Sequence, residues 1–300
     1  MKSVRRHIFC CFIFMLLTFP TTSSARDKAV AVLISREIAP YVEMVEGLEE
    51  GLPEFTVHRF FFDQQGKPYT INGYAELSSR HYCAVVAVGP TALTYLQAHK
   101  KDIPVLFGMV LNPERLIRLG TPHICGVSLN LPISAQLEVI RSLLPSVSRL
   151  GVLFDPANNQ QWFDNAATIA DTNDQIQLVA LPVHSQQQNI KIISDYSGID
   201  AILFIPDKTI ISQAVIRYII KKAFKRHIPV IGYNQFFLDS GAAIAFVVDY
   251  HNSGLQVAAQ VSAAVNTGNC RGIVASEFTV KTNGAVYSAL QLNKAGANNE

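Results

Sequence analysis

The chain has 300 residues, of which 16% are charged and 49% hydrophobic, a balance typical of a compact globular protein with buried sheets. Its 25 basic and 23 acidic residues give a net charge of +2, and removing the three basic residues of the first 25 positions leaves 22 against 23. A nearly neutral body argues against a nucleic-acid groove or an anionic membrane surface as its partner.

Residues 1–25 have the order of a secretory signal peptide. A basic start at 2–7 is followed by an apolar run of twelve residues at 8–19 and by a small-residue cleavage site at 23–25. The run is shorter than the about 20 apolar residues that a membrane-spanning helix needs. We therefore expect cleavage after Ala25 and a mature protein in the periplasm, and an uncleaved N-terminal anchor is the alternative.

After the signal peptide, short β-branched runs alternate with amphipathic helical stretches. In the first half, strands are predicted at 29–35, 55–62, 83–88, 103–110 and 123–129. One helix is predicted at 39–52, and another follows Gly89-Pro90-Thr91 and ends at about His99. In the second half, strands are predicted at 149–154, 176–181, 201–205, 229–231 and 242–248. Between or after them lie a turn at Asp155-Pro156, helical residues at 165–172, and helices centred near Ile193, Ile216 and Val257.

Near-continuous apolar strands separated by helices indicate parallel sheets that are covered on both faces. Two such series predict an α/β protein with two doubly wound parallel-sheet lobes joined by a hinge, and a single (β/α) barrel is the alternative. We expect an N-terminal lobe at 26–130, completed by part of 249–280. The C-terminal lobe is expected at 131–248, completed by part of 281–300.

The expected mature chain has three cysteines, Cys83, Cys125 and Cys270. The first two adjoin apolar strand-like runs and are expected as small core residues. One disulfide is compatible with an oxidising compartment, but the odd number of cysteines leaves its pair open. The histidines are scattered and no zinc spacing is present, so we expect no metal site and no cofactor.

Candidate ligand-binding residues follow the ends of the predicted strands, because ligands of open parallel sheets bind beyond the carboxyl ends of the strands. They are Arg36, Gly89, Pro90, Thr91, Met109, Asn112, Asp155, Asp207, Tyr233, Asn234, Asp249 and Tyr250. This mixture of hydroxyls, amides, carboxylates, one arginine and two tyrosines suits a zwitterion.

Such a zwitterion needs three kinds of contact. Backbone N–H groups of the helix after Gly89, together with the Thr91 hydroxyl, are suited to a carboxylate. Asp207 or Asp249 is suited to an ammonium group, and a tyrosine ring to an apolar side chain. Structural roles are the alternative, because Gly89-Pro90-Thr91 also fits an ordinary strand-to-helix turn, and Asp155 and Asp207 fit turns or helix caps.

Motifs of common enzymes are not found in the sequence. It has no G-x-S-x-G elbow, no phosphate loop ending in Gly-Lys-Ser/Thr, and no G-x-G-x-x-G. We therefore predict a binding protein that is not an enzyme, and we keep a two-lobed transferase as the less favoured alternative.

Several segments resemble the ABC transporter substrate-binding family that includes tryptophan/tyrosine-type binders. In the first half these are SREIAPY at 35–41, VAVGPTA at 86–92, PVLFGMV at 104–110, GVS at 126–128 and QLE at 136–138. In the second half they are IPD at 205–207, PVIGY at 229–233, GAA at 241–243, and Asp249-Tyr250 followed by Gly254. The likeness covers nearly the whole mature chain, and the order and spacing of the segments make it fairly specific.

The resemblance implies a type I periplasmic-binding fold with the ligand in a cleft between two lobes. It implies a monomeric, exported solute-binding protein of an ABC-type transporter, which captures a small ligand by hinge closure and delivers it to an ABC permease. An amino acid or similar zwitterion is favoured. No lipobox of the kind that many members carry is found, so a periplasmic sensor subunit that docks on a membrane signalling receptor is the alternative.

Overall fold

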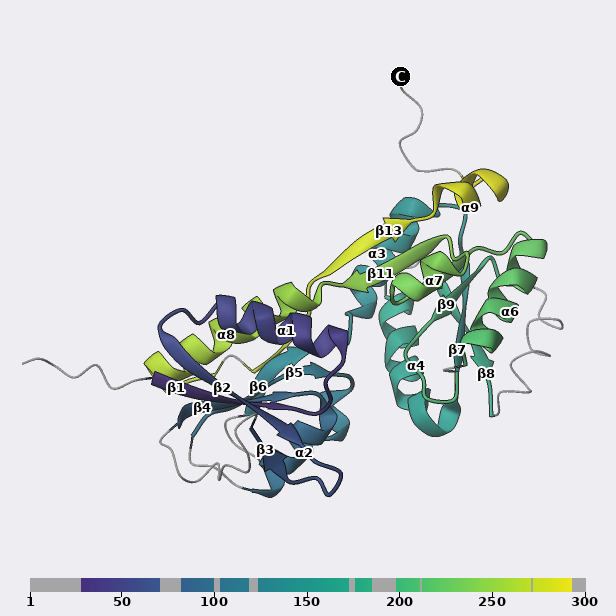
Figure 1. Cartoon of the computed structure of the whole chain (residues 1–300). Coiled ribbons are helices and arrows are strands. Elements are labelled where there is room, and N and C mark those ends of the chain that lie inside the picture. Colours follow the sequence, from purple (N-terminus) through teal and green to yellow (C-terminus); the bar gives the residue numbers. More distant parts are fainter. Residues whose placement is uncertain are drawn as a thin grey trace, which may run out of the picture.

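The computed structural model describes residues 28–70, 82–99, 103–118, 124–172, 176–184, 198–210, 212–270 and 272–292. The predicted signal peptide and the predicted helix near Ile193 lie outside these residues. Within the described part, no helix is long and apolar enough to cross a membrane. The described residues form two α/β lobes, each built on its own sheet (Figure 1).

The first lobe contains a seven-stranded sheet in the order β12-β6-β5-β4-β1-β2-β3. Neighbouring strands are parallel except for the antiparallel β2–β3 pair. The strands are β1 (Lys28–Ile34), β2 (Phe55–Phe62), β3 (Pro68–Tyr69), β4 (Tyr82–Val88), β5 (Val105–Val110), β6 (Ile124–Ser128) and β12 (Ile273–Ala275). The helices are α1 (Ala39–Glu50), α2 (Pro90–Ala98), the 3-10 helix η1 (Pro113–Arg115) and α8 (Tyr250–Thr267).

Both faces of this sheet are covered, which explains why its central strands β1, β4 and β5 are almost wholly apolar. Val30 and Val32 of β1 pack with α1 and α8, whereas Ala31 and Leu33 pack with α2 on the other face. Successive side chains of a strand point to opposite faces, so burial of both faces requires a continuous apolar run.

The second lobe contains a six-stranded sheet in the order β13-β11-β10-β9-β7-β8, in which only the β11–β13 pair is antiparallel within the described residues. Its strands are β7 (Arg149–Phe154), β8 (Gln177–Pro182), β9 (Ala201–Phe204), β10 (Val230–Gly232), β11 (Ile244–Val248) and β13 (Phe278–Thr282). One face carries α3 (Ile133–Leu143), α4 (Pro156–Asp171) and α9 (Gly284–Ala289), and the other carries α6 (Gln213–Lys225) and α7 (Gln235–Asp239).

The predicted fold class of two doubly wound lobes is confirmed, and the barrel alternative is wrong, because two separate open sheets are present. At Asp155-Pro156 the predicted turn is wrong, and the alternative of a helix cap at Asp155 is confirmed. Asp155 is the N-cap of α4 and Pro156 is its first residue, so the helix begins without an intervening turn. Pro at a first helical position loses no intrahelical hydrogen bond.

Helices α1 and α8 lie side by side on the first lobe (Figure 1). Two glycines permit their close contact. A Cβ atom at Gly47 would meet the backbone carbonyl of His251, and a Cβ atom at Gly254 would meet the backbone carbonyl of Met44. This contact attaches α8 firmly to the first lobe, although α8 follows a strand of the second.

The described chain passes between the two sheets three times. The passages follow β6, follow β11, and separate β12 from β13. Three short passages connect the lobes without a long flexible linker, a construction that is compatible with hinge motion between two rigid bodies.

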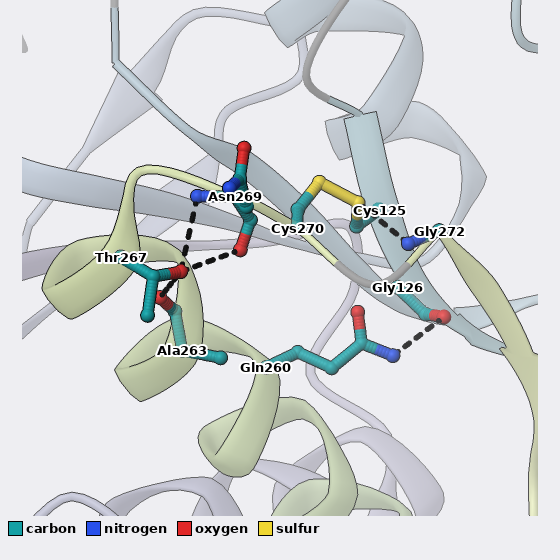
Figure 2. Close-up of a disulfide and its surroundings, with 8 residues drawn as sticks. All are labelled: Cys125, Gly126, Gln260, Ala263, Thr267, Asn269, Cys270 and Gly272. Atoms are coloured by element: carbon teal, nitrogen blue, oxygen red, sulfur yellow. Dashed lines mark hydrogen bonds between the residues drawn. A yellow bond between two sulfur atoms is a disulfide. The ribbon is translucent and has the colours of Figure 1, made fainter.

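A disulfide between Cys125 of β6 and Cys270 fastens the segment after α8 to the first lobe (Figure 2). Their Cα atoms are 5.9 Å apart, and 145 positions separate them in the sequence. The Gly272 amide also donates to Cys125 Sγ at 3.1 Å. Cys83 is a free, half-buried thiol whose Sγ donates to the Ala29 carbonyl at 3.2 Å.

Candidate functional site

A cleft of about 230 Å³ lies between the two lobes, at the carboxyl ends of strands from both sheets. It is lined by Leu111, Asn112, Leu129, Asn130, Leu131, Gln136, Asn159, Trp162, Phe204, Ile205, Pro206, Tyr233, Asn234, Val248 and Tyr250. Helix α4, which carries two of these residues, lies on the side of the second lobe that faces the first (Figure 1). The position is the one expected for a ligand of open parallel sheets.

The lining is apolar and aromatic with a small set of amides. The amides are Asn112, Asn130, Gln136, Asn159 and Asn234, and the aromatic residues are Trp162, Phe204, Tyr233 and Tyr250. None of the described residues that line the cleft is charged. This composition suits a ligand with a substantial apolar surface and a few hydrogen-bonding groups.

The first lobe contributes Asn112, which follows β5 in the left-handed conformation at φ 49°. Its backbone amide donates to Asn130 Oδ1 at 2.9 Å, and the Asn130 amide donates to Ser128 Oγ at 3.0 Å. The loops after β5 and β6 are therefore held together. The Asn112 side-chain amide has no hydrogen-bond partner among the described residues, so its donor and acceptor remain available to a ligand.

In the second lobe, Asp207 holds the cleft wall together from behind. Asp207 is 5% exposed, and its carboxylate accepts from the Asp155 amide at 2.8 Å, from Asn159 Nδ2 at 2.6 Å and from the Thr209 amide at 2.8 Å. These bonds join the ends of β7 and β9 to α4. Asp207 is thus used in fixing Asn159, which does line the cleft.

Asp155 is used in a similar way. Its carboxylate accepts from the Ala157 amide at 2.9 Å as the N-cap of α4, and from the Thr209 hydroxyl at 2.6 Å. The Thr209 hydrogen bond lowers the pKa of the Asp155 carboxyl below its ordinary value, although burial opposes the shift. Neither Asp155 nor Asp207 is among the residues that line the cleft.

Tyr233 and Asn234 form another part of the second-lobe wall, directly after β10. The Tyr233 ring packs 4.7 Å from the Phe237 ring. Burial raises the pKa of the Tyr233 hydroxyl, and the Asp207 carboxylate raises it further, so the hydroxyl stays protonated and able to donate. Asn234 Oδ1 is buried and has no hydrogen-bond partner among the described residues. A buried acceptor of this kind is costly unless a donor reaches it.

The predicted site residues after β1 and β4 are not among the residues that line this cleft. Gly89 adopts φ 88°, and a Cβ atom there would lie 2.7 Å from the Tyr41 hydroxyl oxygen, so only glycine fits. Pro90 and Thr91 are exposed. Arg36 is also exposed and hydrogen-bonds to the Tyr41 hydroxyl.

Ser35, rather than the hydroxyl of Thr91, caps helix α2. Its Oγ accepts from the Ala92 amide at 2.9 Å. The sequence predicted that free backbone N–H groups at the start of α2 would bind a carboxylate. Pro90 has no N–H group, and the Ala92 N–H is already bonded to Ser35, so two of these donors are not available.

The remaining predicted site residues are divided between core, cap and cleft. Met109 is 4% exposed and packs in the core of the first lobe. Asp249 caps α8, with Oδ1 accepting from the Asn252 amide at 2.9 Å. Tyr250 lines the cleft, and burial raises its pKa, as does the Glu43 charge. Four of the twelve predicted residues, Asn112, Tyr233, Asn234 and Tyr250, thus come together in the lining.

Asn159, Trp162 and Arg115 are among the residues near the cleft that were not predicted ligand contacts. Asn159 and Trp162 lie on α4, one turn apart on the same helix face. Arg115, in η1 of the first lobe, donates from Nη2 to Asn159 Oδ1 at 2.8 Å and so connects the lobes. The described residues contain no cluster of three His, Cys, Asp or Glu side chains placed to hold a metal ion.

Comparison with known proteins adds a family match. A family model described as ABC transporter substrate binding protein matches residues 29–291. The tyrosine-binding protein of Clostridioides difficile (strain R20291) is 26% identical over 210 residues, which are 66% of this chain and 60% of that protein. The chain is thus aligned with about three fifths of the length of this relative.

Solved structures match over nearly the full chain. An ABC domain from Streptococcus pneumonia in complex with L-Trp is 18% identical, with a TM-score of 0.61 over 90% of this chain and 97% of that chain. A ligand-free, open substrate-binding protein with adhesive properties from Clostridium difficile is 16% identical, with a TM-score of 0.74 over 91% of this chain and 97% of that chain. The shared feature is the fold, that of type I periplasmic-binding proteins.

Proposed function

The chain belongs to the family of ABC transporter substrate-binding proteins, and we propose that it is an exported receptor for an amino acid with an aromatic or large apolar side chain. In this proposal the mature protein works as a monomer in the periplasm and delivers its ligand to an ABC permease. The tyrosine-binding relative and the L-Trp complex of a structural neighbour support this ligand class.

The observation that carries the proposal is the composition of the interlobe cleft. Trp162, Phe204, Tyr233 and Tyr250 offer aromatic surface, while five amides offer hydrogen bonds without net charge. Its volume of about 230 Å³ lies below the ~300–1,000 Å³ of sites for drug-sized ligands, which favours a small solute. An amino acid with a charged side chain would leave that charge without a partner in the lining.

Hinge closure is the proposed mechanism. The first lobe presents Asn112 and Tyr250, and the second presents Trp162, Tyr233 and Asn234. A ligand that contacts both sets interacts better with a closed arrangement than with an open one, so it shifts the population toward closure. Rotation about the three passages between the sheets would allow this movement while each lobe keeps its own core. The permease then distinguishes closed from open protein.

The ammonium group of such a ligand is assigned to Asn234 in this proposal. Asn234 Oδ1 is a buried acceptor without a protein donor among the described residues, and an ammonium group supplies three donors. The apolar side chain then lies against Tyr233 and Trp162, whose rings give contact area at low entropic cost.

Isothermal titration of residues 26–300 tests the proposal. We expect saturable binding of L-tyrosine, L-tryptophan or L-phenylalanine, and much weaker binding of L-glutamate, L-lysine and myo-inositol. In a parallel unfolding assay, a ligand at one hundred times its Kd should stabilise the fold by about 2.7 kcal/mol. Tyr233→Ala should weaken binding, whereas Tyr218→Ala on α6, outside the lining, should leave it unchanged. Binding of none of the three aromatic amino acids would contradict the proposal.

A further inference from the structure

One cationic side chain reaches the cleft wall from the opposite lobe. Arg115 belongs to η1, which follows β5 of the first lobe, and its Nη2 donates to Asn159 Oδ1 at 2.8 Å. Asn159 belongs to α4 of the second lobe, is 3% exposed and lines the cleft. Arg115 itself is exposed and is not among the lining residues, so its guanidinium lies at the edge of the cleft, one hydrogen bond from the wall.

The charge of Arg115 is not matched by a carboxylate. Its hydrogen-bond partner is a neutral amide, and it forms no ion pair with any described residue. Asn159 in turn donates to the carboxylate of Asp207, which already accepts from three protein donors and does not contact Arg115 by a hydrogen bond or ion pair. A guanidinium has five N–H donors in a planar fork, so one bond to Asn159 leaves others for an anion.

The carboxylate site predicted at the start of α2 in the first lobe is partly used by the protein. Ser35 Oγ accepts from the Ala92 amide at the start of α2, and Pro90 has no N–H group to offer. That helix start also lies outside the cleft lining. The lining itself has no charged residue among those described, and Arg115 is a cation that hydrogen-bonds directly to a lining side chain.

We propose that Arg115 is the receptor for the ligand's α-carboxylate and thereby makes the site selective for amino acids over the corresponding amines. This inference rests on the proposed function, since it concerns the same cleft. The free N–H groups of the fork bind the carboxylate, while Nη2 stays with Asn159 or releases it. Asn234 Oδ1, on the second-lobe wall, receives the ammonium group.

This arrangement gives Arg115 a part in closure as well as in selectivity. Arg115 is anchored to the first lobe, and Asn159 to the second through its 2.6 Å bond to Asp207. A carboxylate bound by Arg115 next to Asn159 would connect the two lobes through the ligand. An amine without the carboxylate would lose the Arg115 contact from the first lobe and would favour closure less.

The test compares two ligands and two arginine variants by isothermal titration of residues 26–300. The ligands are L-tyrosine and tyramine, which differ by the carboxylate alone, with L-tryptophan and tryptamine as a second pair. The variant Arg115→Gln keeps a donor for Asn159 but removes the charge and the fork. Arg118→Gln, three residues further along the chain, is the matched control.

We expect Arg115→Gln to weaken L-tyrosine binding by about 100-fold and to change tyramine binding by less than about threefold, because only the amino acid loses a charged partner. Arg118→Gln should change neither. Equal weakening of both ligands would overturn the inference, because it would reduce Arg115 to a structural contact between the lobes. Unchanged binding of both ligands would overturn it too. If neither amino acid binds the unmodified protein, the proposed function fails and the inference with it.

Discussion

Replacing Asp207 with alanine is expected to destabilise the second lobe, because this carboxylate accepts three hydrogen bonds while only 5% exposed. Hydrogen bonds to a charged group are worth about 1.5–3 kcal/mol each. The Thr209 amide is half-buried, so water replaces part of the loss there. We therefore expect the free energy of unfolding to fall by about 3–5 kcal/mol, which is less than the ~4.5–9 kcal/mol that three full bonds would give.

Urea unfolding followed by tryptophan fluorescence measures this loss directly, because the single tryptophan, Trp162, lies on α4 of the same lobe. Asp207→Asn keeps one acceptor oxygen and should cost less than half as much as Asp207→Ala. Asp239→Ala, at an exposed residue bonded to the exposed Gln235, should change stability by less than about 0.5 kcal/mol. A loss below about 1 kcal/mol for Asp207→Ala would refute the role of Asp207 in fixing this wall.

Three further predictions concern the disulfide, the second-lobe network and the cleft. Cys125→Ser should lower the free energy of unfolding by about 2–5 kcal/mol in denaturant titrations, because the bond closes a long loop, whereas Cys83→Ser should change it by less than about 1 kcal/mol. Thr209→Val should cost about 1 kcal/mol at pH 7. The lowered pKa of the Asp155 carboxyl stabilises the fold at pH values above the ordinary value of 3.8, and this stabilisation is lost as the pH falls through the lowered pKa. The difference in stability between Thr209→Val and the unmodified protein should therefore shrink in thermal melts below pH 3.8. Tyr233→Ala should raise the Kd of an aromatic amino acid about tenfold by calorimetry, and Tyr233→Phe much less.

Most strands of the two sheets were predictable from the sequence, because the central strands of each sheet are buried on both faces. Runs such as 83–88 and 149–154 are apolar at nearly every position, and they form β4 and β7. The strands β12 and β13 were missed. They lie at sheet edges, where Ile273 of β12 is 47% and Val280 of β13 is 37% exposed, so neither has the pattern of a buried strand.

The candidate site was predictable in position but not in detail. Residues after the strands do converge, because the carboxyl ends of parallel strands share one edge of a sheet. The sequence does not show which of these polar side chains turn toward the cleft. Asp207 and Asp155 turn inward to fix the loop and the helix start, whereas Asn234 leaves an acceptor at the wall. That difference depends on contacts between segments about 50 residues apart.

Arg115 and the disulfide illustrate the same limit. Nothing in the local sequence connects Arg115 with Asn159, 44 positions away on the other lobe. Likewise, Cys125 and Cys270 come together only because β12 returns to pair with β6 after the chain has built the second lobe. Contacts of this range follow from topology, which periodicity alone does not give.

Closure of the two lobes around an aromatic amino acid is tested most directly by small-angle X-ray scattering of residues 26–300. The measurement compares the protein alone with the protein saturated with L-tyrosine or L-tryptophan, at a concentration set by the calorimetric Kd. We predict a smaller radius of gyration in the saturated sample and no change with L-glutamate. Superimposable curves under conditions of demonstrated saturation would contradict the account, because the ligand would then bind without drawing the lobes together.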